Sequence, residues 1–132
     1  MDLTPTLLCK MMTAVYGGFG VILGSVGPGL AFGPKSPVSY FTEVGDAAEF
    51  FAHALGALMT LVYSSPFWAG VDAAALAKVM LPANVYFLGL FIYCATTLPA
   101  AKDSTNAILP FNLWWTQVAI GAVMLYVNTQ VV

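Results

Sequence analysis

The stretch AAEFFAHALGALMTLVYSS, residues 47–65, decides the fold class. Glu49 is its only charged residue and His53 its only imidazole, so the stretch is apolar enough for lipid. Small residues recur in it every four positions, and residues four apart share one face of an α-helix. Helices in lipid associate through close van der Waals packing, which small side chains permit. The stretch therefore predicts a transmembrane helix with a seam for a close neighbour, formed by Ala48, Ala52, Gly56, Thr60 and Ser64.

The composition extends this interpretation to the whole chain. The 132 residues are 60% hydrophobic and 8% charged, whereas soluble domains are about 25% charged. A helix that crosses a bilayer needs about 20 residues, and each stretch between or after the charged positions is long enough. We expect an all-α membrane protein, a single domain over residues 1–132, with four transmembrane helices in an up-down-up-down bundle. The uncharged stretches are 11–34, 50–71, 79–101 and 104–132.

Local signals set the expected helix bounds. Thr4 followed by Pro5 is typical of a helix start, and Asp72 can cap a later helix in the same way. The Gly- and Pro-rich segment 27–37 predicts a loop, and a break is expected at Ser64–Pro66. Pro82 should kink the third helix. The expected helices span approximately residues 5–25, 47–63, 73–98 and 111–128.

The first predicted helix offers a face that matches the seam of the second. It carries the pattern Gly20-x-x-x-Gly24, which permits close approach of two backbones. We expect tight packing between helices one and two, with a helix-packing set made of Gly20, Gly24, Ala48, Ala52, Gly56 and Thr60.

His53 and Glu49 are the candidate binding residues, because ionisable groups within a membrane segment are often functional. They lie one turn apart on the second predicted helix. His53, next to the small Ala52 and Gly56, is a candidate axial ligand of a chlorophyll magnesium. The alternative is a hydrogen bond from His53 to Glu49 or to a neighbouring helix. Glu49 is either a partner of the helix dipole, completing an acidic start with Asp46, or a proton relay.

The other polar residues and the cysteines suggest structural roles instead of catalytic or metal-binding roles. Asn84 and Gln117 are expected to form interhelical hydrogen bonds, with a polar path lined together with Glu49 and His53 as the alternative. Cys9 and Cys94 are expected at opposite membrane faces, too far apart for a disulfide. No C-x-x-C or E-x-x-H pattern is present, so no metal site is expected. The chain has no arginine and a net charge of −2, which argues against nucleic acid as a partner.

The layout resembles a known type of membrane protein. A Gly-rich first helix, a Pro-Gly loop, the second-helix triplet Ala54–Leu55–Gly56 and two further helices are similar to the small four-helix proteins of the DoxX-like kind. In its small size, low charge and lack of catalytic residues, the chain also resembles the accessory subunits of algal photosystem I and of divergent respiratory complexes. That resemblance implies docking at the periphery of a complex and a contact with chlorophyll or carotenoid.

We therefore expect a non-enzymatic accessory subunit of a large membrane complex, with lipid and other subunits as partners. A photosynthetic complex in the thylakoid membrane of a plastid is favoured over a respiratory complex of the mitochondrial inner membrane. A small transporter or a quinone-linked membrane protein is the alternative from another class. The lysines are split two and two between the expected faces, so the positive-inside rule gives no orientation.

Overall fold

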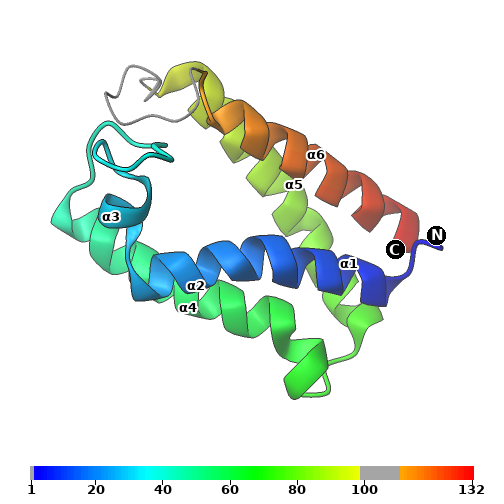
Figure 1. Cartoon of the computed structure of the whole chain (residues 1–132). Helices are drawn as coiled ribbons and strands as arrows, with labels where there is room; N and C mark the ends of the chain where they lie inside the picture. Colours follow the sequence, from blue (N-terminus) through cyan, green and yellow to red (C-terminus); the bar gives the residue numbers. More distant parts are fainter. Residues whose placement is uncertain (1, 99–110) are drawn as a thin grey trace.

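Two pairs of long helices make up the computed structural model, which describes residues 2–98 and 111–132 (Figure 1). In the first pair, α4 packs along a continuous N-terminal helix, and in the second pair α5 packs along α6. The two chain ends lie at the same end of the molecule, beside α1 and the end of α6 (Figure 1). The elements are α1 (Pro5–Met12), η1 (Thr13–Gly17), α2 (Gly18–Ser25), α3 (Pro28–Phe32), α4 (Asp46–Trp68), α5 (Ala73–Thr97) and α6 (Trp114–Val131).

Side-chain caps begin two of the helices where their residue types predict. The Thr4 hydroxyl accepts a hydrogen bond of 3.1 Å from the Leu7 amide, and Pro5 fills the first helical position of α1. The Asp72 carboxylate accepts a 2.8 Å bond from the Ala75 amide at the start of α5. α4 differs, because its N-cap is Gly45 and no side chain caps it. The expected acidic start is nevertheless present, since Asp46 and Glu49 both lie in the first turn of α4.

The second long helix continues beyond the expected break at Ser64–Pro66. α4 ends at Trp68 instead of residue 63. A proline has no amide hydrogen, so Pro66 leaves the carbonyl of Val62 without its usual donor. The Ser65 hydroxyl donates to this carbonyl at 2.7 Å. Since the neighbouring serine supplies the missing hydrogen bond, the helix passes through the proline.

The N-terminal helix contains a wider turn that the sequence did not predict. Thr13–Gly17 forms a π-helical turn between α1 and α2. The Thr13 hydroxyl lies 2.7 Å from the Cys9 carbonyl and 2.8 Å from the Tyr63 carbonyl of α4, and its one hydrogen can be donated to either. Such turns interrupt the regular ladder and frequently lie at functional sites. The Thr13 side chain in this turn thus links the N-terminal helix to α4 by a hydrogen bond.

The segment expected as a plain loop, 27–37, contains the short helix α3. Gly27 precedes α3 with φ of +88°, a conformation that favours glycine. The last helix is also shifted, since α6 begins at Trp114 instead of 111 and runs to Val131. The Asn112 side chain accepts a hydrogen bond from the Trp114 amide at 3.1 Å. The expected loop before α6 lies at 99–110, outside the described residues.

Three of the described helices are long and apolar enough to cross a membrane. They are the N-terminal helix Pro5–Ser25, α4 and α5, and between 17% and 33% of each is buried inside the chain. α6 has 18 residues, including Gln117 and Asn128, and is not among them. The chain is thus all-helical over its described residues and has the make-up of an integral membrane protein, with three clear spanning helices where we expected four.

The buried residues form two clusters, one towards each end of the helix pairs. The first joins α1 to α4, α5 and α6 and includes Cys9, and the second lies beside α3 and includes Cys94. Both cysteines are free and buried. The first cluster contains Leu8, Cys9, Met12, Tyr16, Tyr63, Leu76, Ala77, Met124 and Val127, and the second contains Phe32, Tyr40, Cys94, Ala95, Leu113 and Trp114.

Candidate functional site

The contact between α2 and α4 is made by backbone against backbone. A Cβ atom added to Gly20 would lie 2.6 Å from the Gly56 carbonyl oxygen, and one added to Gly56 would lie 2.6 Å from the Gly24 amide nitrogen. The Thr60 hydroxyl donates across the contact to the Gly17 carbonyl at 3.0 Å. Gly20, Gly24, Gly56 and Thr60 of the predicted packing set therefore meet in one place.

The other two members of the predicted set lie outside this contact. Ala48 is exposed and Ala52 is half-buried. α2 ends at Ser25, and Gly24 already lies against His53 and Ala57 of α4. Beyond that point no part of α2 remains to cover the first turns of α4. The seam is consequently shorter than the four-residue repeat predicts.

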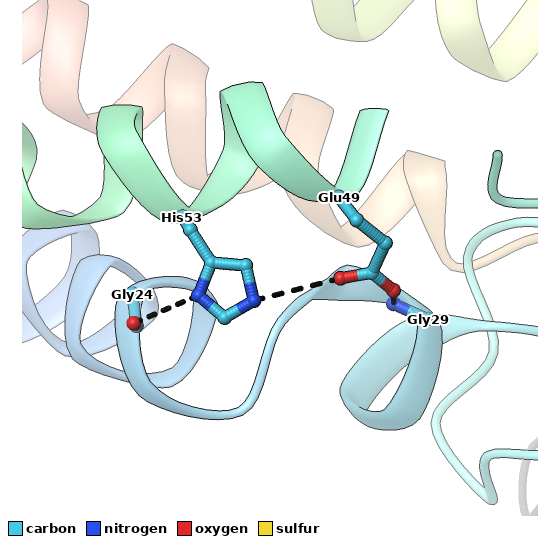
Figure 2. Close-up of polar contacts among 4 residues, drawn as sticks. All are labelled: Gly24, Gly29, Glu49 and His53. Carbon is cyan, nitrogen blue, oxygen red and sulfur yellow. Dashed lines mark hydrogen bonds and ion pairs between the residues drawn. The ribbon is translucent and has the colours of Figure 1, made fainter. Parts of the chain in front are cut away.

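His53 and Glu49 lie at this end of α4, where they hold the turn between α2 and α3 (Figure 2). The His53 Nδ1 donates to the Gly24 carbonyl at 2.9 Å, and Glu49 Oε1 accepts from the Gly29 amide at 2.7 Å. The His53 Nε2 lies 3.6 Å from Glu49 Oε2. The imidazole is 42% exposed and the carboxylate 35%. We call these two side chains the His–Glu clamp.

Each bond of the His–Glu clamp satisfies a backbone group that a helix end leaves open. The last carbonyls of a helix and its first amides have no partner within the helix. Gly24 belongs to the last turn of α2, and Gly29 to the first turn of α3. A negative carboxylate at the start of α3 also suits the helix dipole. The clamp therefore has a structural role as a double cap.

The His–Glu clamp also constrains where protons lie. Because Nδ1 donates to a carbonyl, a neutral imidazole presents only a lone pair at Nε2. An ionised carboxylate is an acceptor as well. The 3.6 Å contact between Nε2 and Glu49 Oε2 is therefore attractive only when a hydrogen lies between the two atoms.

Axial ligation of a chlorophyll magnesium by His53 does not fit this geometry. A ligating imidazole needs one nitrogen with a free lone pair and open space in front of it. Nδ1 is used by Gly24, and Nε2 faces Glu49. A Cβ atom added to Gly27 would lie 2.7 Å from Nε2, so the turn itself fills the approach. The small residues around His53 make room for this turn.

A lateral cavity, which no sequence pattern predicted, lies between the two helix pairs. Its volume is about 230 Å³, and its wall is almost wholly apolar. Leu55 and Leu90 belong to the wall and are also exposed on the outside of the chain, at 50% and 37%. The cavity thus opens towards the lipid-facing surface. Its lining residues are Tyr16, Phe19, Leu23, Phe32, Tyr40, Phe41, Leu55, Met59, Phe87, Leu90, Phe91, Cys94, Trp114 and Gln117.

Aromatic rings form one continuous wall of this cavity. Tyr16 contacts Phe87 at a centroid distance of 5.9 Å, and Phe87 stacks on Phe91 at 6.1 Å. Phe91 in turn contacts Trp114 at 6.5 Å, and Trp114 meets Tyr40 edge-on at 5.2 Å. These are ordinary distances for aromatic pairs. The wall runs from the π-helical turn to the loop after α3.

The polar groups of the lining residues are turned away from the cavity and bury almost all of their surface in the protein. The Tyr40 hydroxyl accepts a hydrogen bond from Gln117 Nε2 at 2.9 Å. Burial raises the pKa of Tyr40, so its hydroxyl keeps a hydrogen that can be donated. The Tyr16 hydroxyl is buried and has no hydrogen-bond partner among the described residues. Gln117, expected to bond to another helix, bonds instead to the loop residue Tyr40.

Asn84 forms the interhelical bond that its position predicts, but with a partner that the sequence reasoning missed. Its Nδ2 donates to Asn128 Oδ1 at 2.7 Å, and Asn128 Nδ2 donates to the Ala77 carbonyl at 2.9 Å. Both side chains are buried between α5 and α6. A polar residue within an apolar segment was the available signal for Asn128. The network lies apart from the His–Glu clamp, so the four polar residues do not line one path.

No family model, curated protein or solved structure matches this chain. The likeness to DoxX-like proteins and to photosystem accessory subunits therefore stays a prediction, and any functional proposal depends on the geometry of the chain itself.

Proposed function

We propose that this chain is a non-catalytic accessory subunit of a large membrane protein complex, and that it docks through the outer face of α4. The observation that carries the proposal is the position of α4 at the edge of the molecule. One side of α4 packs on the N-terminal helix and α3. Only 17% of its spanning window is buried, although the helix is long and apolar enough to cross a membrane.

The pattern of side chains on this outer face suits a protein neighbour. Exposed residues follow one another at intervals of three and four, so they share one face. Three small and two large side chains are interspersed along it, which offers holes for the knobs of a facing helix. Lipid chains adapt to any apolar surface and need no such relief. We define this docking face as Ala47, Phe50, Ala54, Ala57 and Leu61.

The proposed occupant is a transmembrane helix of a neighbouring subunit. We place the complex in a photosynthetic membrane, with a mitochondrial respiratory complex as the alternative, on the strength of the resemblance in kind. The apolar docking face and the aromatic-lined cavity suit a subunit that fills space between larger membrane proteins.

Native electrophoresis after mild detergent extraction tests the proposal. The tagged chain is expected to migrate with a complex far larger than 14 kDa, whose other subunits are identified by mass spectrometry. Ala54→Trp should release the chain from that complex by filling a hole in the docking face. Ala122→Trp is the matched control, because Ala122 is also exposed but lies on α6.

Two results would contradict the proposal. A wild-type chain that migrates alone, or only with copies of itself, would show that it has no partner subunit of another kind. Equal retention of Ala54→Trp and Ala122→Trp in the complex would show that the docking face of α4 does not contact a neighbouring subunit. Helical circular dichroism of both variants shows that neither result reflects unfolding.

A further inference from the structure

We infer that the lateral cavity binds part of one acyl chain of a bilayer lipid and makes no contact with the headgroup of that lipid. This inference goes beyond the proposed docking role and does not depend on it, because the cavity lining and the docking face of α4 have no residue in common. It rests on the polarity of the wall, the position of the opening along the spanning helices and the volume of the cavity.

The wall of the cavity excludes ligand groups that need a hydrogen bond, because it presents almost no polar surface. The polar atoms of its residues bond to one another instead. The Gln117 amide donates to the Tyr40 hydroxyl at 2.9 Å, and the Trp114 ring nitrogen donates to the Tyr40 carbonyl at 3.1 Å. A polar group buried here without a hydrogen bond would be costly. The part of a ligand that enters is therefore hydrocarbon.

The opening of the cavity lies at the depth of lipid acyl chains. Leu55 and Leu90 line the cavity and are also exposed on the outside of the chain. Because α4 and α5 are consecutive spanning helices, the start of α4 and the end of α5 lie at one face of the membrane. At 1.5 Å per residue, Leu55 is about 14 Å from the start of α4 and Leu90 about 11 Å from the end of α5. In a hydrocarbon core about 30 Å thick, both positions face the acyl chains of one leaflet.

The volume of the cavity suits part of one chain. An engineered apolar cavity of roughly 150 Å³ holds the six carbons of benzene, so the present cavity of about 230 Å³ has room for roughly nine. A wall without partner atoms forfeits dispersion contacts, and a flexible chain that enters the cavity restores them. The rest of the lipid stays in the bilayer. Acyl chains surround the opening, so they reach it without a carrier.

Quenching by brominated lipid tests the inference with the full chain in lipid nanodiscs. A Trp68→Phe, Trp115→Phe background leaves Trp114, in the cavity wall, as the one tryptophan of the chain. Trp114 is only 9% exposed. Phosphatidylcholine with bromine on its acyl chain should nevertheless quench the fluorescence of Trp114, because the chain enters the cavity beside it.

Two double variants in this background test the location. Leu55→Phe with Leu90→Phe narrows the opening and should reduce the quenching of Trp114. Leu58→Phe with Val85→Phe is the matched control and should leave the quenching unchanged, because it alters exposed residues of the same two helices outside the lining. Helical circular dichroism shows that both variants are folded.

A dilution series separates recognition of the chain from recognition of the headgroup. Unbrominated phosphatidylcholine and unbrominated phosphatidylglycerol with the same acyl chains should relieve the quenching equally, since the wall has no polar surface for a headgroup.

Three results would overturn the inference. They are an unquenched Trp114, equal quenching in the two double variants, and a dilution curve that depends on the headgroup. Lipid extraction of the chain purified from native membranes gives a further check, because a stoichiometric carotenoid or quinone in place of an acyl lipid would contradict the inference.

Discussion

The two helix pairs of this protein are held together in different ways. In the α2–α4 pair, Gly20 and Gly56 bring two backbones into direct contact. In the α5–α6 pair, Gly121 instead faces the ring of Phe91, and two buried asparagines link the helices. Small residues and interhelical hydrogen bonds are the two main means by which helices associate in lipid. Both pairs have interhelical hydrogen bonds, such as Thr60 to Gly17 in the first, but only the first also has backbone against backbone.

The difference predicts how each pair tolerates change. A backbone contact cannot adjust, because both partners are parts of rigid helices. A side-chain contact can adjust by a rotation of the side chain. We therefore expect the largest loss of stability from added volume in the α2–α4 pair, and a smaller loss from deleted hydrogen bonds in the α5–α6 pair.

Gly56→Ala should have the largest effect. The new Cβ would lie 2.6 Å from both the Gly20 carbonyl oxygen and the Gly24 amide nitrogen, so the helices must separate. We expect a loss of about 3 kcal/mol, the upper part of the range for overpacking. Thermal unfolding in detergent, followed by circular dichroism, measures it. Gly18→Ala is the matched control, since nothing lies near its Cβ position. Similar melting temperatures for the two variants would contradict the backbone contact.

Asn128→Leu tests the α5–α6 pair and should have the next largest effect. It removes the bonds to Asn84 and to the Ala77 carbonyl and leaves the Asn84 amide without its best acceptor. Interhelical hydrogen bonds in membranes are worth about 0.6 kcal/mol each, and up to about 1.7, so a loss of about 1–2 kcal/mol is expected. Thr129→Leu, at an exposed neighbouring position, is the control. An Asn128→Leu variant as stable as wild type would show that the network is dispensable.

The His–Glu clamp fixes only the end of the α2–α4 pair and should matter less. Glu49→Ala removes the acceptor of the Gly29 amide, and because the carboxylate is 35% exposed we expect a loss of about 1 kcal/mol. Glu49→Gln keeps an acceptor for Gly29 and gains an amide donor for His53 Nε2, so it should stay close to wild type. Hydrogen exchange at the amides of α3 measures the local effect. Equal exchange in both variants would show that the Gly29 bond is not protective.

Much of this arrangement could be predicted from neighbouring residues in the sequence. Thr4, Pro5 and Asp72 act on amides within three positions, so their role as caps follows from local spacing. The Gly20-x-x-x-Gly24 pattern likewise marks a face that can approach another helix closely. Such features need no knowledge of the distant chain, because a helix fixes which residues share a face.

The parts that could not be predicted depend on distant partners or on compensation. Pro66 looked like a helix end, but the Ser65 hydroxyl replaces the missing amide. His53 looked like a free ligand, but Gly24, Gly27 and Glu49 surround its nitrogens only after the turn has folded. The cavity joins side chains from α2, α4, α5 and α6, and no local pattern encodes that meeting.

Gly89→Ala should have the smallest effect and the opposite sign. Gly89 lies within α5, is exposed, and has nothing within 4 Å of its Cβ position. Replacing a glycine inside a helix by alanine stabilises it by about 0.5–1 kcal/mol, because the unfolded backbone loses freedom. The same change at Gly56 should destabilise the protein, so paired melting curves separate a glycine that makes a contact from one that does not. A destabilised Gly89→Ala variant would show that α5 has a close neighbour at this point, where no part of the described structure lies.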